Sequence, residues 1–221
     1  MKKLYLLVML LIMTACSDTS EQKSILERSD CAFPCWNGIV VGETTETELL
    51  KILGTFPDID QETIEITDTA DNVFDHNVYF SFRQSWTLGH HRKLIANADI
   101  ANDKVGALIF CGEINITIGE LVEQIGEPEN IISGNNIGGG RGVILTLPVK
   151  GLAFWYTAKL SNLEITPDTQ IDCIEIFYPA LYYEMLDIGS FSAGYYNAEE
   201  TLRVMYPWDG YGNLDEKYPP R

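Results

Sequence analysis

The stretch TETELLKILG, residues 45–54, has a counterpart further along the chain in TIGELVEQIG, residues 117–126. The two stretches share four identities, which fall at Thr45/Thr117, Glu48/Glu120, Leu49/Leu121 and Gly54/Gly126. Threonine followed three residues later by glutamate is a capping box, which satisfies the free backbone amides at a helix start. Apolar residues follow at helical spacing, and both glycines are placed to end a helix in a left-handed conformation. The sequence therefore predicts two short helices with matching starts and ends.

Short β-branched and aromatic segments follow each predicted helix. The segments are ETIEIT (62–67), NVYFSFR (77–83), KLIANADI (93–100) and KVGALIF (104–110) after the first helix, and GVILTL (142–147), GLAFWYT (151–157) and CIEIFY (173–178) after the second. Such segments, separated by turn residues, are typical of antiparallel strands. We therefore expect an α+β fold of two tandem repeats, residues 31–112 and 113–180, each a short capped helix followed by an antiparallel sheet.

Residues 181–221 do not fit a third copy of this pattern. Asn197 and Glu200 are spaced as in a capping box, which predicts one more helix. The segment after that helix is aromatic and rich in turn residues. We expect Tyr206, Trp208 and Tyr211 to pack against the sheet, because large aromatic side chains are costly to leave in water.

The N-terminus has the pattern of an export signal. Lys2 and Lys3 precede an uncharged apolar stretch, residues 4–13, that is shorter than the roughly 20 residues a membrane-spanning helix needs. With Thr14 and Ala15 before Cys16, the segment resembles a bacterial lipoprotein signal, although Met13 stands where leucine is usual. The resemblance implies signal residues 1–15, lipidation of Cys16, a polar tether over residues 16–30, and an extracytoplasmic protein anchored to the membrane of the cell envelope. An ordinary secretory signal is the alternative.

The helix motifs also carry a resemblance. TIGELVEQIGEP (117–128) and VGETTETELLKILGTFP (41–57) look like the helix motif of the small outer-membrane-assembly lipoproteins SmpA/OmlA (BamE), whose fold occurs as a tandem pair in the β-lactamase-inhibitor protein. The first copy has one extra residue before its proline, and the second lacks the glycine before its cap. PCWNGI (34–39) is similar to a PCW-x-G-I motif of uncharacterised lipoproteins. The resemblance covers about residues 35–180 and implies a non-catalytic, protein-contacting role, but carries over no functional residue.

Four cysteines besides Cys16 allow two disulfides with three connectivities, and the sequence does not choose among them. Cys31–Cys35 is the first expectation, and Cys111–Cys173 then follows, with buried free thiols as the alternative for the second pair. Catalysis by Cys35 is disfavoured, because a nucleophilic thiol needs a neighbouring base or cation. We therefore name no catalytic residue.

No metal or cofactor site is predicted. His90 and His91 are adjacent, which places their side chains on opposite faces of a strand. Asp75 and His76 could join them in a metal set, but the four residues lack a recognised metal-ligand spacing. Asp99 and Asp103 lack the glycine and terminal glutamate of a calcium loop, and SGNNIGGGRG (133–142) lacks the Lys-Ser/Thr of a phosphate loop. The net charge of −17 disfavours nucleic acid as a partner.

The sequence thus favours a membrane-anchored module that binds another protein. Aromatic residues on strand faces, namely Tyr79, Trp155 and Tyr156, are the predicted contact surface, and packing of these rings against the helices is an equal alternative. The rival hypothesis is an extracytoplasmic, hydrolase-like enzyme that uses His90 and His91 or a carboxylate cluster.

Overall fold

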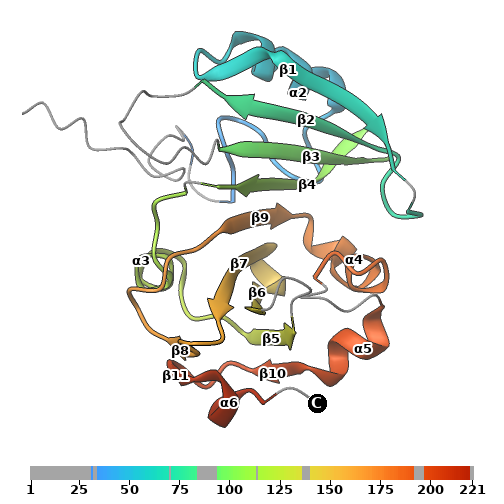
Figure 1. Ribbon diagram of the computed structural model, residues 1–221. Helices are drawn as coiled ribbons and strands as arrows, with labels where there is room; N and C mark the ends of the chain where they lie inside the picture. Colours follow the sequence, from blue (N-terminus) through green and yellow to red (C-terminus); the bar gives the residue numbers. More distant parts are fainter. Residues whose placement is uncertain are drawn as a thin grey trace, which may run out of the picture.

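The computed structural model describes residues 31, 34–69, 71–83, 94–112, 114–135, 140–191 and 197–219. It confirms an α+β fold built on a nine-stranded antiparallel sheet in the order β1-β2-β3-β4-β9-β7-β6-β5-β10 (Figure 1). The strands of this sheet are β1 (Ile59–Asp68), β2 (His76–Phe82), β3 (Ile95–Ala101), β4 (Lys104–Cys111), β5 (Asn130–Asn135), β6 (Gly140–Leu147), β7 (Leu152–Lys159), β9 (Cys173–Phe177) and β10 (Met205–Pro207). Two short strands, β8 (Glu164–Ile165) and β11 (Gly212–Asn213), pair separately.

The helices in the described part of the chain are few and short. They are α2 (Glu46–Thr55), α3 (Ile118–Ile125), α4 (Tyr182–Asp187), α5 (Ala198–Arg203) and α6 (Leu214–Lys217), with 3₁₀ turns η1 (Pro148–Lys150) and η2 (Pro179–Leu181). Both predicted capping boxes are confirmed: the Glu48 amide donates to Thr45 and the Glu120 amide donates to Thr117, while each glutamate accepts from its threonine amide.

The ends of the two predicted helices differ from each other. Gly126 ends α3 with a positive φ of +92°, which favours glycine, but its ψ of 171° differs from the left-handed helical conformation that was predicted. The expectation for Gly54 is wrong, because α2 continues through it to Thr55 and ends at Phe56 in an extended conformation. The Thr55 hydroxyl donates to the carbonyls of Lys51 and Ile52, and so adds hydrogen bonds within this last turn.

The chain orders the strands of the two halves as mirror images in the sheet. α2 precedes β1 to β4, α3 precedes β5, β6, β7 and β9, and the last strands of the two halves pair with each other (Figure 1). The cap residue of each helix also bridges to the chain at the start of that half's last strand, Thr45 to Lys104 and Thr117 to Gln170. Lys104 is the first residue of β4, and Gln170 lies three residues before β9, so each helix start is fixed close to the last strand of its own half.

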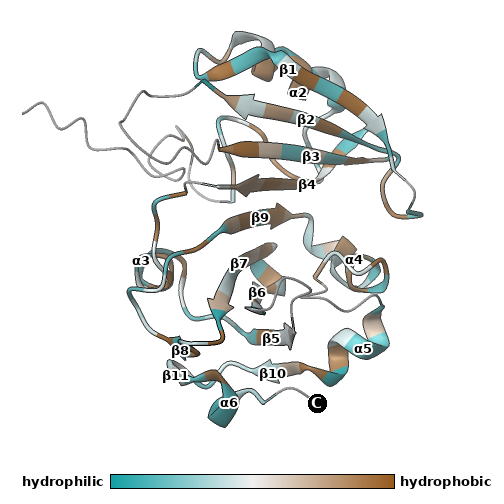
Figure 2. Cartoon of the chain, in the orientation of Figure 1, coloured by the Kyte–Doolittle hydropathy of each residue, from teal (hydrophilic) through white to brown (hydrophobic). Residues whose placement is uncertain are grey.

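The sheet buries both faces to different extents. One face packs against α2 and α3 through a large cluster that includes Leu49, Leu53, Ile118 and Leu121. The other face carries a smaller cluster, in which Met185 and Leu186 of α4 lie over the second half of the sheet. In Figure 2 the central strands β4, β9 and β7 are largely apolar, as expected for strands that are covered on both sides.

Trp36 anchors the segment that leads into α2. Its backbone pairs with Ile39 across a two-residue turn in which Asn37 and Gly38 both have positive φ, the signature of an Asn-Gly hairpin. The indole is only 1 % exposed and contacts the rings of Phe56, Phe80, Phe82 and Phe110. Trp36 is therefore a core residue, and the Cys31–Cys35 disulfide lies next to it in the chain.

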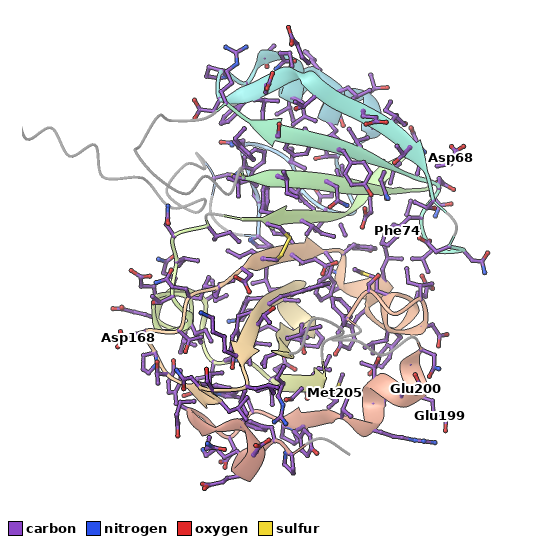
Figure 3. The ribbon with its side chains drawn as sticks, in the orientation of Figure 1. Asp68, Phe74, Asp168, Glu199, Glu200 and Met205 are labelled. Atoms are coloured by element: carbon purple, nitrogen blue, oxygen red, sulfur yellow. A yellow bond between two sulfur atoms is a disulfide. The ribbon has the colours of Figure 1, made fainter. Side chains whose placement is uncertain are left out.

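The C-terminal segment packs on the sheet as predicted. Asn197 caps α5 by accepting from the Glu200 amide, and β10 then joins the sheet beside β5. The Trp208 ring stacks on Tyr218, and Tyr206, Trp208 and Tyr211 pack against the main core. Figure 3 shows the α5–β10 connection at the labelled residues Glu199, Glu200 and Met205.

Candidate binding face

The three aromatic residues of the predicted contact surface lie on two faces. Tyr79 is 43 % exposed, and Trp155 is half-buried on the same face of the sheet. Tyr156 is a correction: it is the next residue on β7, points to the opposite face and is 6 % exposed within the main core. Of the three predicted residues, Tyr79 is the one that lines the hollow described below, whereas Trp155 packs against the smaller cluster under α4.

Strand register places the neighbours of Tyr79 and Trp155. Tyr79 is opposite Asn97, which is opposite Ile109, which is opposite Glu175. Because directly opposed residues share a face, these side chains form one row across four strands. The adjacent row runs from Ser81 through Ile95, Cys111 and Cys173 to Trp155.

These rows surround a shallow hollow of about 280 Å³, which we call the open face and define by Thr63, Tyr79, Ser81, Ile95, Asn97, Ile109 and Cys111. Ile95, one of its lining residues, is 54 % exposed. The continuation of this face over the second half of the sheet is covered by α4 (Figure 1). Among the described residues, no helix covers the open face as α4 covers the second half of the sheet.

An acidic pair, Asp99 and Glu175, lies next to the open face. Asp99 is 7 % exposed and accepts a hydrogen bond from the Asn97 side-chain amide. Burial raises the pKa of the Asp99 carboxyl to about 7, although the hydrogen bond from Asn97 opposes the shift. Glu175 is fully buried, and neither carboxylate oxygen has a hydrogen-bond partner among the described residues. Burial raises the pKa of Glu175 well above its ordinary value, and Asp99 adds to the shift.

The cysteine pairing is confirmed as Cys31–Cys35 and Cys111–Cys173. Cys111 and Cys173 are directly opposite each other on β4 and β9, with Cα atoms 4.2 Å apart. In Figure 3 the bridge lies between these two strands, where the halves of the sheet meet. Because Cys111 lines the open face, this disulfide forms part of its floor.

The remaining candidates give no catalytic or metal-binding arrangement in the described part of the chain. Cys16, His90 and His91 lie outside the described residues. His76 Nε2 is 3.2 Å from Glu46 Oε1, so it contacts the start of α2, and Asp75 accepts from the Asn102 amide. No group of three histidine, cysteine or acidic side chains within the described ranges is placed to hold a metal ion.

Sequence reasoning missed the acidic pair. In the segment CIEIFY the polar Glu175 between two isoleucines is typical of a strand with one wet face. The structure instead buries both faces at this position, because β9 is a central strand of the sheet. Only the nonlocal pairing of β9 with β4 and β7 brings Glu175 near Asp99, and no local signal reports that pairing.

Comparison with known proteins gives no match to a protein-family model, to a curated protein or to a solved structure. Across the ranges that the structure describes, no helix has both the length and the apolar character to cross a membrane.

Proposed function

We propose that this protein is a non-catalytic binding module that docks another protein on its open face. The observation that carries the proposal is the difference between the two halves of the sheet. α4 covers the second half, whereas Tyr79 and Ile95 remain substantially exposed on the first. An exposed tyrosine and isoleucine around a hollow are the kind of surface that anchors protein partners.

The charge around the open face favours a basic partner. Glu65 on the edge strand β1 is opposite Tyr79, and Asp60 is opposite Ser81, so acidic residues flank the hollow. The chain as a whole carries a net charge of −17. Complementary charge steers association and disfavours partners of the same sign. We therefore propose a partner that presents lysine or arginine side chains to this face.

Tandem repeats remain part of the proposal. The two capping boxes, the mirrored strand order and the matching cap-to-strand bridges at Thr45 and Thr117 support two copies of one helix-plus-sheet unit. These features also fit the resemblance to the SmpA/OmlA (BamE) lipoproteins and the β-lactamase-inhibitor protein. That resemblance implies a protein-contacting role, which agrees with the proposed use of the open face.

We further propose a lipid anchor on Cys16 that holds the domain outside the cytoplasm at a membrane of the cell envelope. The sequence pattern before Cys16 supports the anchor, and the two disulfides fit an oxidising compartment. Metabolic labelling with palmitate tests this. The wild type should incorporate label and Cys16→Ser should not; labelling that persists in Cys16→Ser would overturn the anchor.

Site-specific crosslinking tests the open face. A photoreactive residue replaces Tyr79 or Ile95 in the full chain, expressed in a bacterial envelope. As a matched control, the same residue replaces Tyr183, which is 75 % exposed on α4. We expect the same partner at positions 79 and 95 but not at 183, and capture that falls as salt is raised. Equal capture at all three positions, or none at 79 and 95, would contradict the proposed docking face.

A further inference from the structure

A second polar cluster lies on the opposite face of the sheet, within the main core. Ser133 on β5 is opposite Val143 on β6, which is opposite Tyr156 on β7. Arg141 lies two residues before Val143, so it shares their face and is diagonal to both Ser133 and Tyr156. Three strands thus direct a hydroxyl, a phenol and a guanidinium into one region, which we call the Arg141 cluster: Ser133, Arg141 and Tyr156.

The polar atoms of this cluster are deeply buried. Ser133 is 0 % exposed, Arg141 4 % and Tyr156 6 %. Ser133 Oγ, Tyr156 OH, Arg141 Nε and Arg141 Nη1 have no hydrogen-bond partner among the described residues. A buried polar group without a partner destabilises the folded state, and a buried charge without one destabilises it more. Such a concentration of unpartnered donors within one face calls for an acceptor.

The one acceptor on this guanidinium in the described part of the chain is peripheral. Arg141 Nη2 contacts Asp215 Oδ1 at 2.6 Å, but the Asp215 side chain is 54 % exposed at the start of α6. Asp215 therefore approaches the guanidinium from the solvent side. The Nε–H and the Nη1 hydrogens, on the buried part of the group, are left unmatched.

Tyr156 is set up as a hydrogen-bond donor rather than an anion. Burial raises the pKa of its phenol above the ordinary value, with Tyr218 adding to the shift and Arg141 opposing it. These influences also show that Arg141 and Tyr218 lie near the phenol. The Tyr218 hydroxyl is itself satisfied, since it accepts from the Asp209 amide and donates to the Gly210 carbonyl.

We propose that the Arg141 cluster is a binding site for a small monovalent anion of the halide class. The cluster supplies the free N–H groups of Arg141 and the two hydroxyls, all of which donate. Charge-assisted hydrogen bonds of this kind are the strong ones in proteins. The acidic chain opposes anions at long range, but salt screens that field beyond about 10 Å, whereas Arg141 acts at contact.

The first test is thermal unfolding of the full chain while sodium chloride replaces sodium gluconate at constant ionic strength. A ligand that binds only the folded state raises the melting temperature as its concentration grows. We expect a saturable rise for the wild type. Tyr156→Phe and Ser133→Ala keep the guanidinium, and each should weaken the apparent chloride affinity by about tenfold at most, the effect of one hydrogen bond.

Asp215→Asn separates an anion site from a structural ion pair. The substitution removes the carboxylate that competes with the anion for Arg141. The variant should therefore be less stable than the wild type in gluconate, regain that stability in chloride, and bind chloride with a tighter apparent affinity. Arg141→Met should abolish the chloride-dependent rise in melting temperature. Arg203→Met is its matched control, because it removes an exposed arginine that pairs with Glu199 and makes the same change in net charge. Arg203→Met should leave the chloride-dependent rise in melting temperature unchanged.

Diffraction from crystals soaked in sodium bromide locates the site. An anomalous peak within contact distance of Arg141 in the wild type, reduced in Tyr156→Phe, is the expected result. No chloride-dependent rise in the wild type, an equal response in Arg141→Met, or no bromide at Arg141 would each overturn the proposal. In those cases the cluster is a structural feature of the core.

Discussion

At the scale of single residues, burial sets the behaviour of Asp99. Its carboxyl titrates at about 7 in the folded protein against 3.8 ordinarily, because removal from water penalises the charged form. The folded state therefore binds the proton more tightly than the unfolded chain does. This contribution to stability is complete below about pH 4 and is lost as pH rises through about 7. Asn97 offsets part of the cost of burial, whereas the charge of Asp71 adds to it.

Asp99→Asn should therefore flatten the fall in unfolding free energy between about pH 4 and 7. At pH 7 the variant should be more stable than the wild type, by roughly 2–4 kcal/mol at most, since one pKa unit corresponds to about 1.4 kcal/mol. Urea denaturation at several pH values measures this. Asp103→Asn, an exposed position in the turn after β3, is the control and should keep the wild-type slope. An unchanged slope in Asp99→Asn would contradict the role of burial.

Two glycines before α2 test local geometry. Gly38 and Gly42 share a φ of +80°, but a Cβ on Gly42 would lie 2.5 Å from the Tyr178 ring, whereas on Gly38 it would meet no described atom within 4 Å. Gly38→Ala should cost about 1–2 kcal/mol for the left-handed backbone alone. Gly42→Ala should lower the free energy of unfolding by more than Gly38→Ala does, as measured by denaturant midpoints. In a Tyr178→Ala background the two losses should become more nearly equal. Equal losses of stability in Gly38→Ala and Gly42→Ala would show that the Tyr178 ring moves aside at no cost.

At the scale of elements, local chemistry determined what the sequence could predict. A capping box involves residues three apart, so Thr45 and Thr117 could be placed from sequence, and both caps form. The Asn37-Gly38 turn was equally readable as a hairpin signal, although we predicted none there. The prediction that Gly54 ends α2 was wrong, because the end of the helix depends on how the chain continues toward β1, which sequence spacing does not report.

Thr45→Ala and Thr117→Ala should each reduce the free energy of unfolding by about 0.5–2 kcal/mol, because the first amides of the helix lose their acceptor. Thr55→Ala serves as the control on α2, since its hydroxyl donates to carbonyls in the last turn and caps no amide. It should change stability by much less. Chemical denaturation of the three variants decides the matter; no loss at either cap would undermine their shared structural role.

At the scale of the whole molecule, the sequence predicted the α+β class and the strands but not how the halves join. The pairing of β4 with β9 connects residues far apart in the chain, and a strand pattern does not specify its partner. The same nonlocal pairing decides which of the neighbours Trp155 and Tyr156 faces the core, and buries Glu175 in a strand that reads as half-exposed. The sequence could therefore predict individual aromatic residues of the candidate site but not which residues would be their neighbours.

The Cys111–Cys173 disulfide should matter most for this junction. It links β4 to β9 across a separation of 62 residues, whereas Cys31–Cys35 spans 4. Because a crosslink restricts the unfolded chain more when its loop is longer, the double variant Cys111→Ala/Cys173→Ala should lose about 4 kcal/mol of unfolding free energy. The control double variant Cys31→Ala/Cys35→Ala should lose about 2 kcal/mol. Equal losses in urea denaturation, or a larger loss in the control, would mean that loop length does not govern stability here and that the β4–β9 ladder holds the halves together without its disulfide.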